Sequence, residues 1–297
     1  MSDELQVAFD QPMCVGECPL WDAAASILYW VDIDGFAVHR LIPSSGEHRA
    51  WPMQSEPCAI ALHAGGGLLV ALRSYFAHLD TDSGALTPIA PAPYDAKLYR
   101  FNDGRADAGG RFWVGTMYEP RTEPAAEMFC LERGEVRRAW SGGMTVSNGL
   151  AFSPDGKNMN HADTTSHRID RYAFDAANGA ASGPQPFQRF SDDKAAPGYG
   201  GRPDGAAVDS EGAYWCAMFE GGRVLRFSPD GELLREVKVP LRCPTMVAFG
   251  GDDLRTLYIT SAGLKRPMEE RQQYPLSGQL LSLRVDVPGL PEPRYRP

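Results

Sequence analysis

The sequence has 297 residues, 43% of them hydrophobic, and a formal net charge of −9 at pH 7. No apolar run approaches the roughly 20 residues of a membrane-spanning helix, and no cluster of Lys and Arg offers a surface for phosphates, so we expect neither a membrane nor a nucleic acid as partner. The length suits one large all-β or α/β-barrel domain, or two smaller domains, and such a chain buries a core without disulfides.

The N-terminal segment, MSDELQVAFD, is polar and acidic and lacks the basic and apolar regions of a signal peptide. The cysteines are scattered and form no C-x-x-C pair, which favours reduced thiols over a zinc site or a disulfide framework. They stand at Cys14, Cys18, Cys58, Cys130, Cys216 and Cys243. Together these features predict a protein of a reducing compartment, and we expect it to be cytoplasmic.

Short β-rich runs alternate with turn clusters along the chain, and the 31 Gly and 24 Pro residues are evenly spread. In chain order the runs include ILYWVDI (27–33), GLLVAL (67–72), RFWVGTM (111–117), AYWCAM (213–218) and TLYITS (256–261). This pattern is typical of an all-β protein. A single helical turn is predicted at 268–274, MEERQQY.

One phrase recurs six times in the same register: a lead residue, a short apolar run, a turn with Gly, and a second apolar run. The lead residues are Glu17, Cys58, Asn102, Asn148, Asp204 and Thr245, and successive ones are 41 to 56 residues apart. Each phrase predicts a β-hairpin, and the residues between phrases suit two more strands. Four strands every 40 to 50 residues or so are typical of a β-propeller blade.

The sequence therefore predicts a six-bladed β-propeller with four antiparallel strands per blade, forming a single domain over residues 1–297. We expect the N-terminal LQVAF (5–9) and the C-terminal GQLLSLRVDV (278–287) to meet in one blade and close the ring. An irregular β-sandwich is the alternative, and the fixed register of the six phrases argues against it.

The innermost strands of a propeller run along a central channel, so the six lead residues are expected to meet around one axis. Four of them carry a carboxylate or a carboxamide: Glu17, Asn102, Asn148 and Asp204. Taken singly, each is explained by the tendency of Asp and Asn to bond their own backbone in turns. Four such residues at one channel mouth favour a binding site instead.

Bringing Glu17 and Asp204 together without a cation would force one of the two carboxylates to take up a proton. A divalent metal ion resolves this conflict, with neutral carbonyl oxygens supplied by Asn148 and, as a further candidate, Asn102. Oxygen ligands suit Ca²⁺, Mg²⁺ or Mn²⁺, and Zn²⁺ is an alternative. We predict one divalent metal ion of undetermined identity.

Arg100 stands two residues before Asn102. In an extended strand, residues two apart point to the same side, so both side chains are expected to face the channel. Two interpretations remain open for this arginine. It pairs with a carboxylate of the site, or it donates charge-assisted hydrogen bonds to substrate oxygens.

Four segments in order resemble the senescence-marker-protein/gluconolactonase/regucalcin family: VGECPLWD (15–22), RFNDGRADAGGRFWVGTM (100–117), VSNGLAFSPDGK (146–157) and PDGAAVDSEGAYW (203–215). The resemblance implies a six-bladed propeller that binds one divalent cation and hydrolyses sugar lactones. It implies that Glu17, Asn148 and Asp204 are metal ligands, that Asp204 is also the catalytic base, and that Arg100 and Asn102 contact substrate.

Two stretches, 158–161 and the position of Glu119, differ from the repeated phrase. After the SPDGK turn the family usually has an aromatic strand, whereas this chain has NMNHADT, with Asn158, Asn160 and His161 at apolar positions. His161 is explained either by packing or surface variation or by reaching the channel and adjusting substrate choice. Glu119 lies where the family's variable loop overhangs the site, and we predict that it contacts substrate.

The predicted activity is metal-dependent opening of an aldonolactone, such as a gluconic, xylonic, arabinonic or galactonic lactone, to the open-chain acid. The metal would polarise the ester carbonyl, and Asp204 would deprotonate a water molecule. The alternatives are a non-enzymatic calcium-binding or regulatory propeller and a hydrolase of phosphotriesters or lipophilic lactones. The expected partner is a small sugar lactone, and the expected state is a monomer or a weak homo-oligomer.

Overall fold

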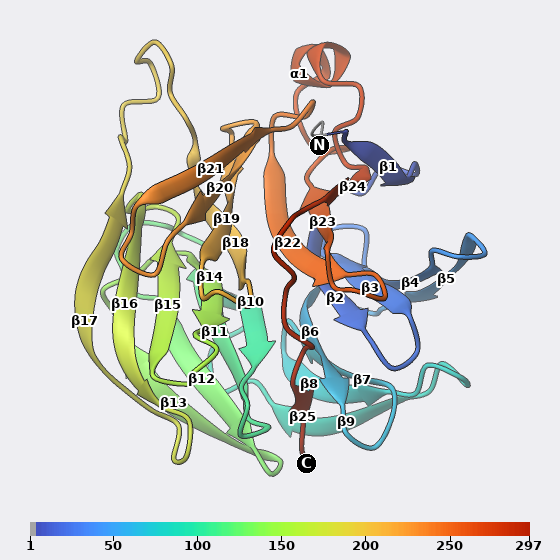
Figure 1. Cartoon of the computed structure of the whole chain (residues 1–297). Coiled ribbons are helices and arrows are strands. Elements are labelled where there is room, and N and C mark those ends of the chain that lie inside the picture. The colour runs from blue at the N-terminus through green and yellow to red at the C-terminus, as the bar shows by residue number, and fades with distance from the viewer. Residues whose placement is uncertain (1–3) are drawn as a thin grey trace.

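Six antiparallel sheets follow one another around a central axis in the computed structural model, which describes residues 4–297 (Figure 1). Each sheet contains four antiparallel strands, and the second carries one additional parallel strand. The predicted six-bladed propeller is therefore confirmed. Residues 1–3, which begin the acidic N-terminal segment and the predicted 1–297 domain, lie outside the described residues.

From the axis outward, blade 1 contains β2 (Gly16–Asp22), β3 (Ile27–Asp32), β4 (Ala37–Ile42) and β5 (Glu47–Pro52). Blade 2 contains β6 (Pro57–His63), β7 (Leu68–Leu72), β8 (Tyr75–Leu79) and β9 (Leu86–Pro91). Blade 3 contains β10 (Tyr99–Ala106), β11 (Phe112–Tyr118), β12 (Glu127–Glu132) and β13 (Glu135–Ser141).

Blade 4 contains β14 (Ser147–Phe152), β15 (Asn158–Asp163), β16 (Arg168–Asp175) and β17 (Ala180–Arg189). Blade 5 contains β18 (Arg202–Val208), β19 (Tyr214–Phe219), β20 (Arg223–Phe227) and β21 (Leu233–Lys238). Blade 6 contains β22 (Pro244–Gly250), β23 (Thr256–Ser261), β24 (Leu280–Arg284) and β1 (Gln6–Phe9). The predicted helical turn is α1 (Met268–Gln273), and the last strand along the chain is β25 (Arg294–Tyr295).

Burial follows the distance from the axis. Every residue of β6 and β22, both innermost strands, is buried, whereas the outermost strand β17 contains no buried residue. A strand that is buried on both faces needs apolar or small side chains throughout, and one that faces solvent does not. The core therefore lies between neighbouring blades, and its largest cluster joins blades 1, 2 and 3.

The ring is closed by β1, which pairs antiparallel with β24 as the outermost strand of blade 6 (Figure 1). Phe9 at the end of β1 packs against Trp30 of blade 1, with ring centroids 5.1 Å apart, and against His48, at 4.4 Å. The N-terminal strand thus joins the last blade to the first. The prediction that residues 5–9 and 278–287 meet in one blade and close the ring is confirmed.

The repeated Asp and Trp of the phrase are hydrogen-bonded to each other. In blade 3 the indole Nε1 of Trp113 donates to Asp107 Oδ2 at 2.9 Å, and in blade 5 that of Trp215 donates to Asp209 Oδ2 at 2.9 Å. Both aspartates are completely buried. Each is also paired with an arginine, Asp107 with Arg111 at 2.7 Å and Asp209 with Arg226 at 2.8 Å. The repeat therefore encodes a structural ion pair that fixes each of these two hairpin turns.

The pairing register of all six innermost strands shifts at the lead residue or directly after it. In β10, for example, Phe101 pairs with Thr116 and Gly104 with Val114, so two residues of the inner strand oppose one of its partner. Such a β-bulge bends the strand and redirects a side chain. The bulge is the local device that turns the lead residues toward the axis.

The C-terminal segment covers the opposite end of the inner strands and ends in β25, which pairs in parallel with β6 (Figure 1). Arg105 of blade 3 donates to Glu292 at 2.5 Å, to the carbonyl of Leu150 at 3.1 Å and to that of Ala206 at 2.8 Å. One guanidinium therefore joins three blades to the C-terminal segment. This arrangement leaves the lead-residue end of the channel for a cavity.

Candidate functional site

A cavity of about 290 Å³ opens at the lead-residue end of the channel. The sequence-predicted residues Glu17, Arg100, Asn102, Asn148 and Asp204 all line it, together with the lead residue Thr245. Segments almost 190 residues apart in the chain thus contribute to one space. The lead residue Cys58 is buried but is not part of this lining.

A chain of hydrogen bonds fixes the two amides. Arg100 Nη1 donates to Asn102 Oδ1 at 2.7 Å, and Asn102 Nδ2 donates to Asn148 Oδ1 at 2.9 Å and to the carbonyl of Ser147 at 2.8 Å. Asn148 Nδ2 then donates to Thr164 Oγ1 at 2.7 Å. Each amide nitrogen is thereby directed at a protein acceptor. The Asn148 carbonyl keeps one lone pair for a further partner.

Three carboxylates create the negative potential of the site. The pKa of Glu17 is raised well above its usual range by burial and by the negative charges of Asp204 and Asp103. The pKa of Asp204, which is 6% exposed, is also raised well above its usual range, by burial and by the charge of Asp103. Asp103 is buried as well, and one of its carboxylate oxygens has no hydrogen-bond partner. The fold therefore holds these acids together against their mutual repulsion.

The donor set fits a hard divalent cation. A cation between Glu17 and Asp204 would offset the two negative charges, and the free lone pair of the Asn148 carbonyl would supply a neutral oxygen ligand. Among residues 4–297 no group of three or more His, Cys, Asp and Glu side chains is placed to hold a metal ion. The set at this cavity is of another kind, because it contains two carboxylates, Glu17 and Asp204, and the amide oxygen of Asn148.

Positively charged side chains also line the cavity, and the sequence patterns did not predict most of them. They are Arg121, Arg202, Lys265 and Arg266, in addition to the predicted Arg100. One signal was available for Arg202, which stands two residues before Asp204 as Arg100 stands two before Asn102. The other three lie on loops, where no strand periodicity marks the direction of a side chain.

Glu119 does not line the cavity. Its carboxylate forms two bonds of 2.9 Å with the guanidinium of Arg73, which also binds Glu56 at 2.8 Å. Arg73 lowers the pKa of Glu119 through these bonds, so the carboxylate stays ionised. Contact between Glu119 and substrate stays a prediction, and the structure gives this residue a clear second task, which is to anchor the loop after β11.

His161 lies between the central site and a second cavity on the side of the ring. Its Nε2 is 2.8 Å from Ser147 Oγ, and Ser147 directly precedes Asn148. The unusual strand NMNHAD still forms β15, because Asn160 accepts from Arg171 at 2.9 Å and Met159 is buried. His161 is 3% exposed and does not line the central cavity.

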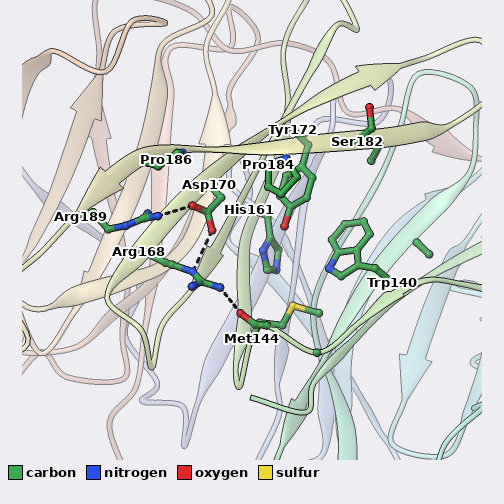
Figure 2. A pocket seen from close by; sticks show the side chains of 14 residues that line it. Trp140, Met144, His161, Arg168, Asp170, Tyr172, Ser182, Pro184, Pro186 and Arg189 are labelled. Carbon is green, nitrogen blue, oxygen red and sulfur yellow. Dashed lines mark hydrogen bonds and ion pairs between the residues drawn. The ribbon is translucent and has the colours of Figure 1, made fainter. Parts of the chain in front are cut away.

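The second cavity, of about 550 Å³, lies among residues of β13, β16 and β17 (Figure 2). Figure 2 shows Arg168 and Arg189 directed at Asp170 between them, with ion-pair distances of 3.0 and 2.8 Å. The rings of Trp140 and Tyr172 stack with centroids 5.1 Å apart. Asp170 thus supplies one counter-charge for two arginines, and this cavity, unlike the central one, brings no pair of carboxylates together among its described lining residues.

All six cysteines are free thiols, as predicted. Burial raises the pKa of Cys58 to about 11 and that of Cys130 to about 12, so these thiols are protonated at neutral pH. The helices found in residues 4–297 are too short or too polar to cross a bilayer. Neither observation adds a residue to the candidate site.

Known proteins resemble this chain over all six blades. A family model described as SMP-30/Gluconolactonase/LRE-like region matches residues 15–263, a range that contains all six lead residues. The chain is 44% identical over 295 residues to 6-deoxy-6-sulfogluconolactonase from Pseudomonas putida, with 99% of both chains covered. It is 30% identical over 290 residues to regucalcin from Xenopus laevis, covering 95% of this chain and 94% of the relative.

Among solved structures, the calcium-binding protein regucalcin from Agrobacterium tumefaciens superimposes with a TM-score of 0.93. It is 29% identical in sequence, and the match covers 99% of this chain and 98% of that one. The family match, the full-length relatives and the shared fold agree with one another. The chain belongs to the SMP-30/gluconolactonase/LRE-like family.

Proposed function

We propose that this protein hydrolyses sugar lactones to the corresponding aldonic acids with the help of one divalent cation. The observation that carries the proposal is the convergence of Glu17, Asn148 and Asp204 on one cavity, where burial and like charge favour a bound cation. The names of relatives support the reaction, since one is a sulfogluconolactonase and another, 34% identical, is a pentonolactonase from Haloferax volcanii.

Glu17, Asn148 and Asp204 would hold the cation, whether Ca²⁺, Mn²⁺, Mg²⁺ or Zn²⁺. When bound, such an ion polarises the lactone carbonyl and favours the negative charge that develops on its oxygen. Asp204 accepts the proton of the attacking water, which a carboxylate does well only in its ionised form. The base stays ionised at the loaded site, because a nearby positive charge opposes the rise in the pKa of Asp204.

Arg100 and Asn102 would orient the lactone. The Arg100 guanidinium carries five N–H donors, of which two serve the carbonyl of Phe101 at 2.9 Å and Asn102 Oδ1 at 2.7 Å. Further donors remain for substrate oxygens. Both N–H groups of Asn102 are already used, so its contact with a sugar hydroxyl would be made by Oδ1 acting as acceptor.

The test is an activity screen on protein stripped with a chelator. Glucono-, xylono-, arabinono- and galactonolactone are each combined with Ca²⁺, Mg²⁺, Mn²⁺ or Zn²⁺, and acid release is followed in a pH-stat. We expect metal-restored hydrolysis and a loss of about 100-fold or more in Asp204→Asn and Asn148→Ala. Asp230→Asn, an exposed turn residue of the same blade, is the matched control. Absence of metal-restored acid release on every lactone would refute the proposal.

One competing function has support from a relative, because the Agrobacterium tumefaciens protein is described as calcium-binding. A calcium-binding protein without turnover would bind Ca²⁺ at the same three residues. Calorimetry separates the two functions. Tight Ca²⁺ binding that is lost in Glu17→Gln, combined with no hydrolysis under any metal, would favour binding alone.

A further inference from the structure

The cavity carries more positive than negative charge among its described lining residues. Five of them are cationic and three are acidic: Arg100, Arg121, Arg202, Lys265 and Arg266, against Glu17, Asp34 and Asp204. Lys265 is paired with Asp34 at 3.1 Å. If a dication matches Glu17 and Asp204, as proposed above, the remaining arginines have no counter-charge of their own within the described lining of the cavity.

Arg202 shares its carboxylate partner with two other cations. Glu220 is 3.3 Å from Arg202, 3.1 Å from Lys194 and 3.4 Å from Arg266. A single negative charge thus serves three positive ones, and Arg266 has a second partner, Glu270, at 2.7 Å. The Nε of Arg202 is buried and has no hydrogen-bond partner. A buried donor without an acceptor is costly, and a bound anion would satisfy it.

Arg121 is the second unmatched cation. It lies in the loop between β11 and β12, is exposed, and its side chain contacts Met117 Sδ at 3.2 Å. The Glu119 carboxylate, whose charge also acts on Arg121, is paired with Arg73 at 2.9 Å. Desolvation and the positive charges of Arg202 and Arg100 lower the pKa of Arg121, against an opposing effect from the charge of Glu119.

The backbone holds Arg121 in place at some cost. Its φ of +54° lies in the left-handed region, which L-residues other than Gly, Asn and Asp rarely adopt. The turn is fixed by a bond of 3.1 Å from the Arg121 amide to the Tyr118 carbonyl and by one of 2.9 Å from the Glu119 amide to Leu98. The bidentate pair of Glu119 with Arg73 completes the anchor.

We infer that Arg121 and Arg202 form a subsite for a sulfonate or phosphate group carried on the carbon chain of the lactone. This inference rests on the proposed lactonase function and adds the substrate class to it. A planar guanidinium with several N–H donors matches the oxygens of such groups. Glu17, Asn148 and Asp204 would then hold the cation at the reacting ester, and Arg121 and Arg202 would bind the anionic substituent.

The experiment compares glucono-1,5-lactone with its 6-deoxy-6-sulfo and 6-phospho analogues on the metal-loaded protein. The quantity measured is the ratio of kcat/KM for each charged lactone to kcat/KM for the neutral one. In Arg121→Gln we expect this ratio to fall about 10- to 100-fold, as for the loss of a charge-assisted hydrogen bond. Arg121→Lys should retain a large part of it, and the difference between the two charged analogues shows whether sulfonate or phosphate is preferred.

Arg133→Gln is the matched control, because Arg133 also sits in a turn with a left-handed φ, +51°, but does not line the cavity. A ratio that falls equally in both variants, or in neither, would overturn the inference. Arg202→Lys provides a second variant. It keeps the positive charge that pairs with Glu220 but lacks the several N–H donors of a guanidinium. It should lower the ratio without unfolding the protein, which circular dichroism checks.

A binding measurement separates failure of this inference from failure of the proposed function. Calorimetry on wild type and Arg121→Gln compares gluconate with 6-deoxy-6-sulfogluconate. If no lactone is hydrolysed, but the sulfonated acid binds and Arg121→Gln weakens this binding, the lactonase function is refuted and the anion subsite is supported. If neutral lactones are hydrolysed and Arg121 raises kcat/KM for neither charged analogue, the lactonase function is supported and the subsite is refuted. Absence of binding of the sulfonated acid also overturns the subsite.

Discussion

Glu17 and Asp204 are held together by strands of blades 1 and 5, and their raised pKa values express the cost of that arrangement. A carboxyl whose pKa is higher in the folded than in the unfolded state destabilises the fold when the pH is above its unfolded value. At neutral pH the metal-free protein therefore carries an electrostatic penalty at its own site. A bound cation removes that penalty, so the site links stability to metal content.

Glu17→Gln should stabilise the metal-free protein at pH 7 while abolishing the proposed activity. The neutral amide removes one of the three buried carboxylates that repel one another, and we expect a gain of about 1 to 3 kcal/mol in the free energy of unfolding. The gain should shrink as the pH falls toward the ordinary pKa of Glu, because wild-type Glu17 is then protonated as well. Urea denaturation in the presence of a chelator measures this.

The control for Glu17→Gln is Glu232→Gln, which changes an exposed turn residue and should leave stability within about 0.5 kcal/mol of wild type. Excess cation should stabilise the wild type, by about 2.7 kcal/mol at 100 times the dissociation constant, but not Glu17→Gln. A metal-free Glu17→Gln protein less stable than wild type would show that the carboxylates do not repel one another.

His161 supplies a second residue with a pH signature. Burial lowers its pKa to about 4, against opposing effects from the charges of Asp163 and Asp170, while Arg168 lowers it further. An unfolded His binds a proton near pH 6.5, so between about pH 6.5 and 4 the unfolded state binds more protons than the folded one. Stability from this residue is therefore fully present above pH 6.5 and is lost as the pH falls toward 4.

His161→Gln tests this sign. Gln keeps a hydrogen-bonding group for Ser147 but does not titrate, so the variant should lose less stability on acidification. On acidification to about pH 4, the free energy of unfolding should fall by about 3 kcal/mol more in the wild type than in the variant. Denaturation curves at several pH values provide the measurement. His39, whose pKa is also lowered to about 4, is unchanged in both proteins and cancels in the comparison. Parallel pH profiles would contradict the prediction.

At the level of the element, the repeated phrase encodes one feature of every hairpin and a second feature in two of them. The bulge in the innermost strand directs the lead residue, and in blades 3 and 5 the buried Asp fixes the turn that follows. In blade 5, Asp209 accepts from the indole of Trp215 and from Arg226, and its other oxygen accepts two backbone N–H groups. Each carboxylate oxygen thus serves two donors, so a substitution at this position leaves several buried donors unpaired.

Asp209→Asn should destabilise the protein by about 2 to 4 kcal/mol. The amide nitrogen would replace one acceptor oxygen opposite a donor and would leave Arg226 without its buried counter-charge. Trp215→Phe, which removes one bond, should cost about 1 to 2 kcal/mol. The control is Asp155→Asn in the corresponding turn of blade 4, where the residue is exposed. Thermal and urea unfolding measure all three, and an equal effect of the two Asp variants would refute the argument.

For the whole molecule, ring closure depends on a strand of only four residues, β1. Its contribution is side-chain packing as well as pairing, since Phe9 is 8% exposed and rests between Trp30 and His48. A closed ring has no free sheet edge where it joins, whereas an open one exposes a row of backbone groups. Closure should therefore govern both stability and solubility.

Phe9→Ala should lower the free energy of unfolding by about 3 to 5 kcal/mol, the usual cost of truncating a buried Phe. Val7→Ala on the same strand is the matched control, because Val7 is 43% exposed, and it should cost well under about 1 kcal/mol. Urea unfolding provides both values. Similar losses in the two variants would show that strand pairing, and not the Phe9 packing, holds the ring closed.

Much of this protein was accessible from sequence. The six-fold register of the phrase predicted the blades, the ring closure and the inward direction of the lead residues, because a repeat imposes the same local geometry each time it occurs. The same register identified Glu17, Asn102, Asn148 and Asp204 as neighbours, and strand alternation added Arg100. All five line one cavity. Loops were harder to interpret, since Glu119 was singled out and the cavity residue is Arg121, two positions later.

The sequence by itself determined the fold and the acidic half of the site, since both depend on strand periodicity and on residue types that repeat. Only the tertiary structure decided four of the five cationic lining residues, since Arg100 alone was predicted from the strand pattern. Arg121, Lys265 and Arg266 come from loops of two different blades, and Arg202 lies at the start of β18 in a third. Loop side chains follow no period, so their meeting point depends on the packing of the closed ring. The balance of charge in the cavity therefore cannot be worked out from any one segment, because it depends on which loops meet there.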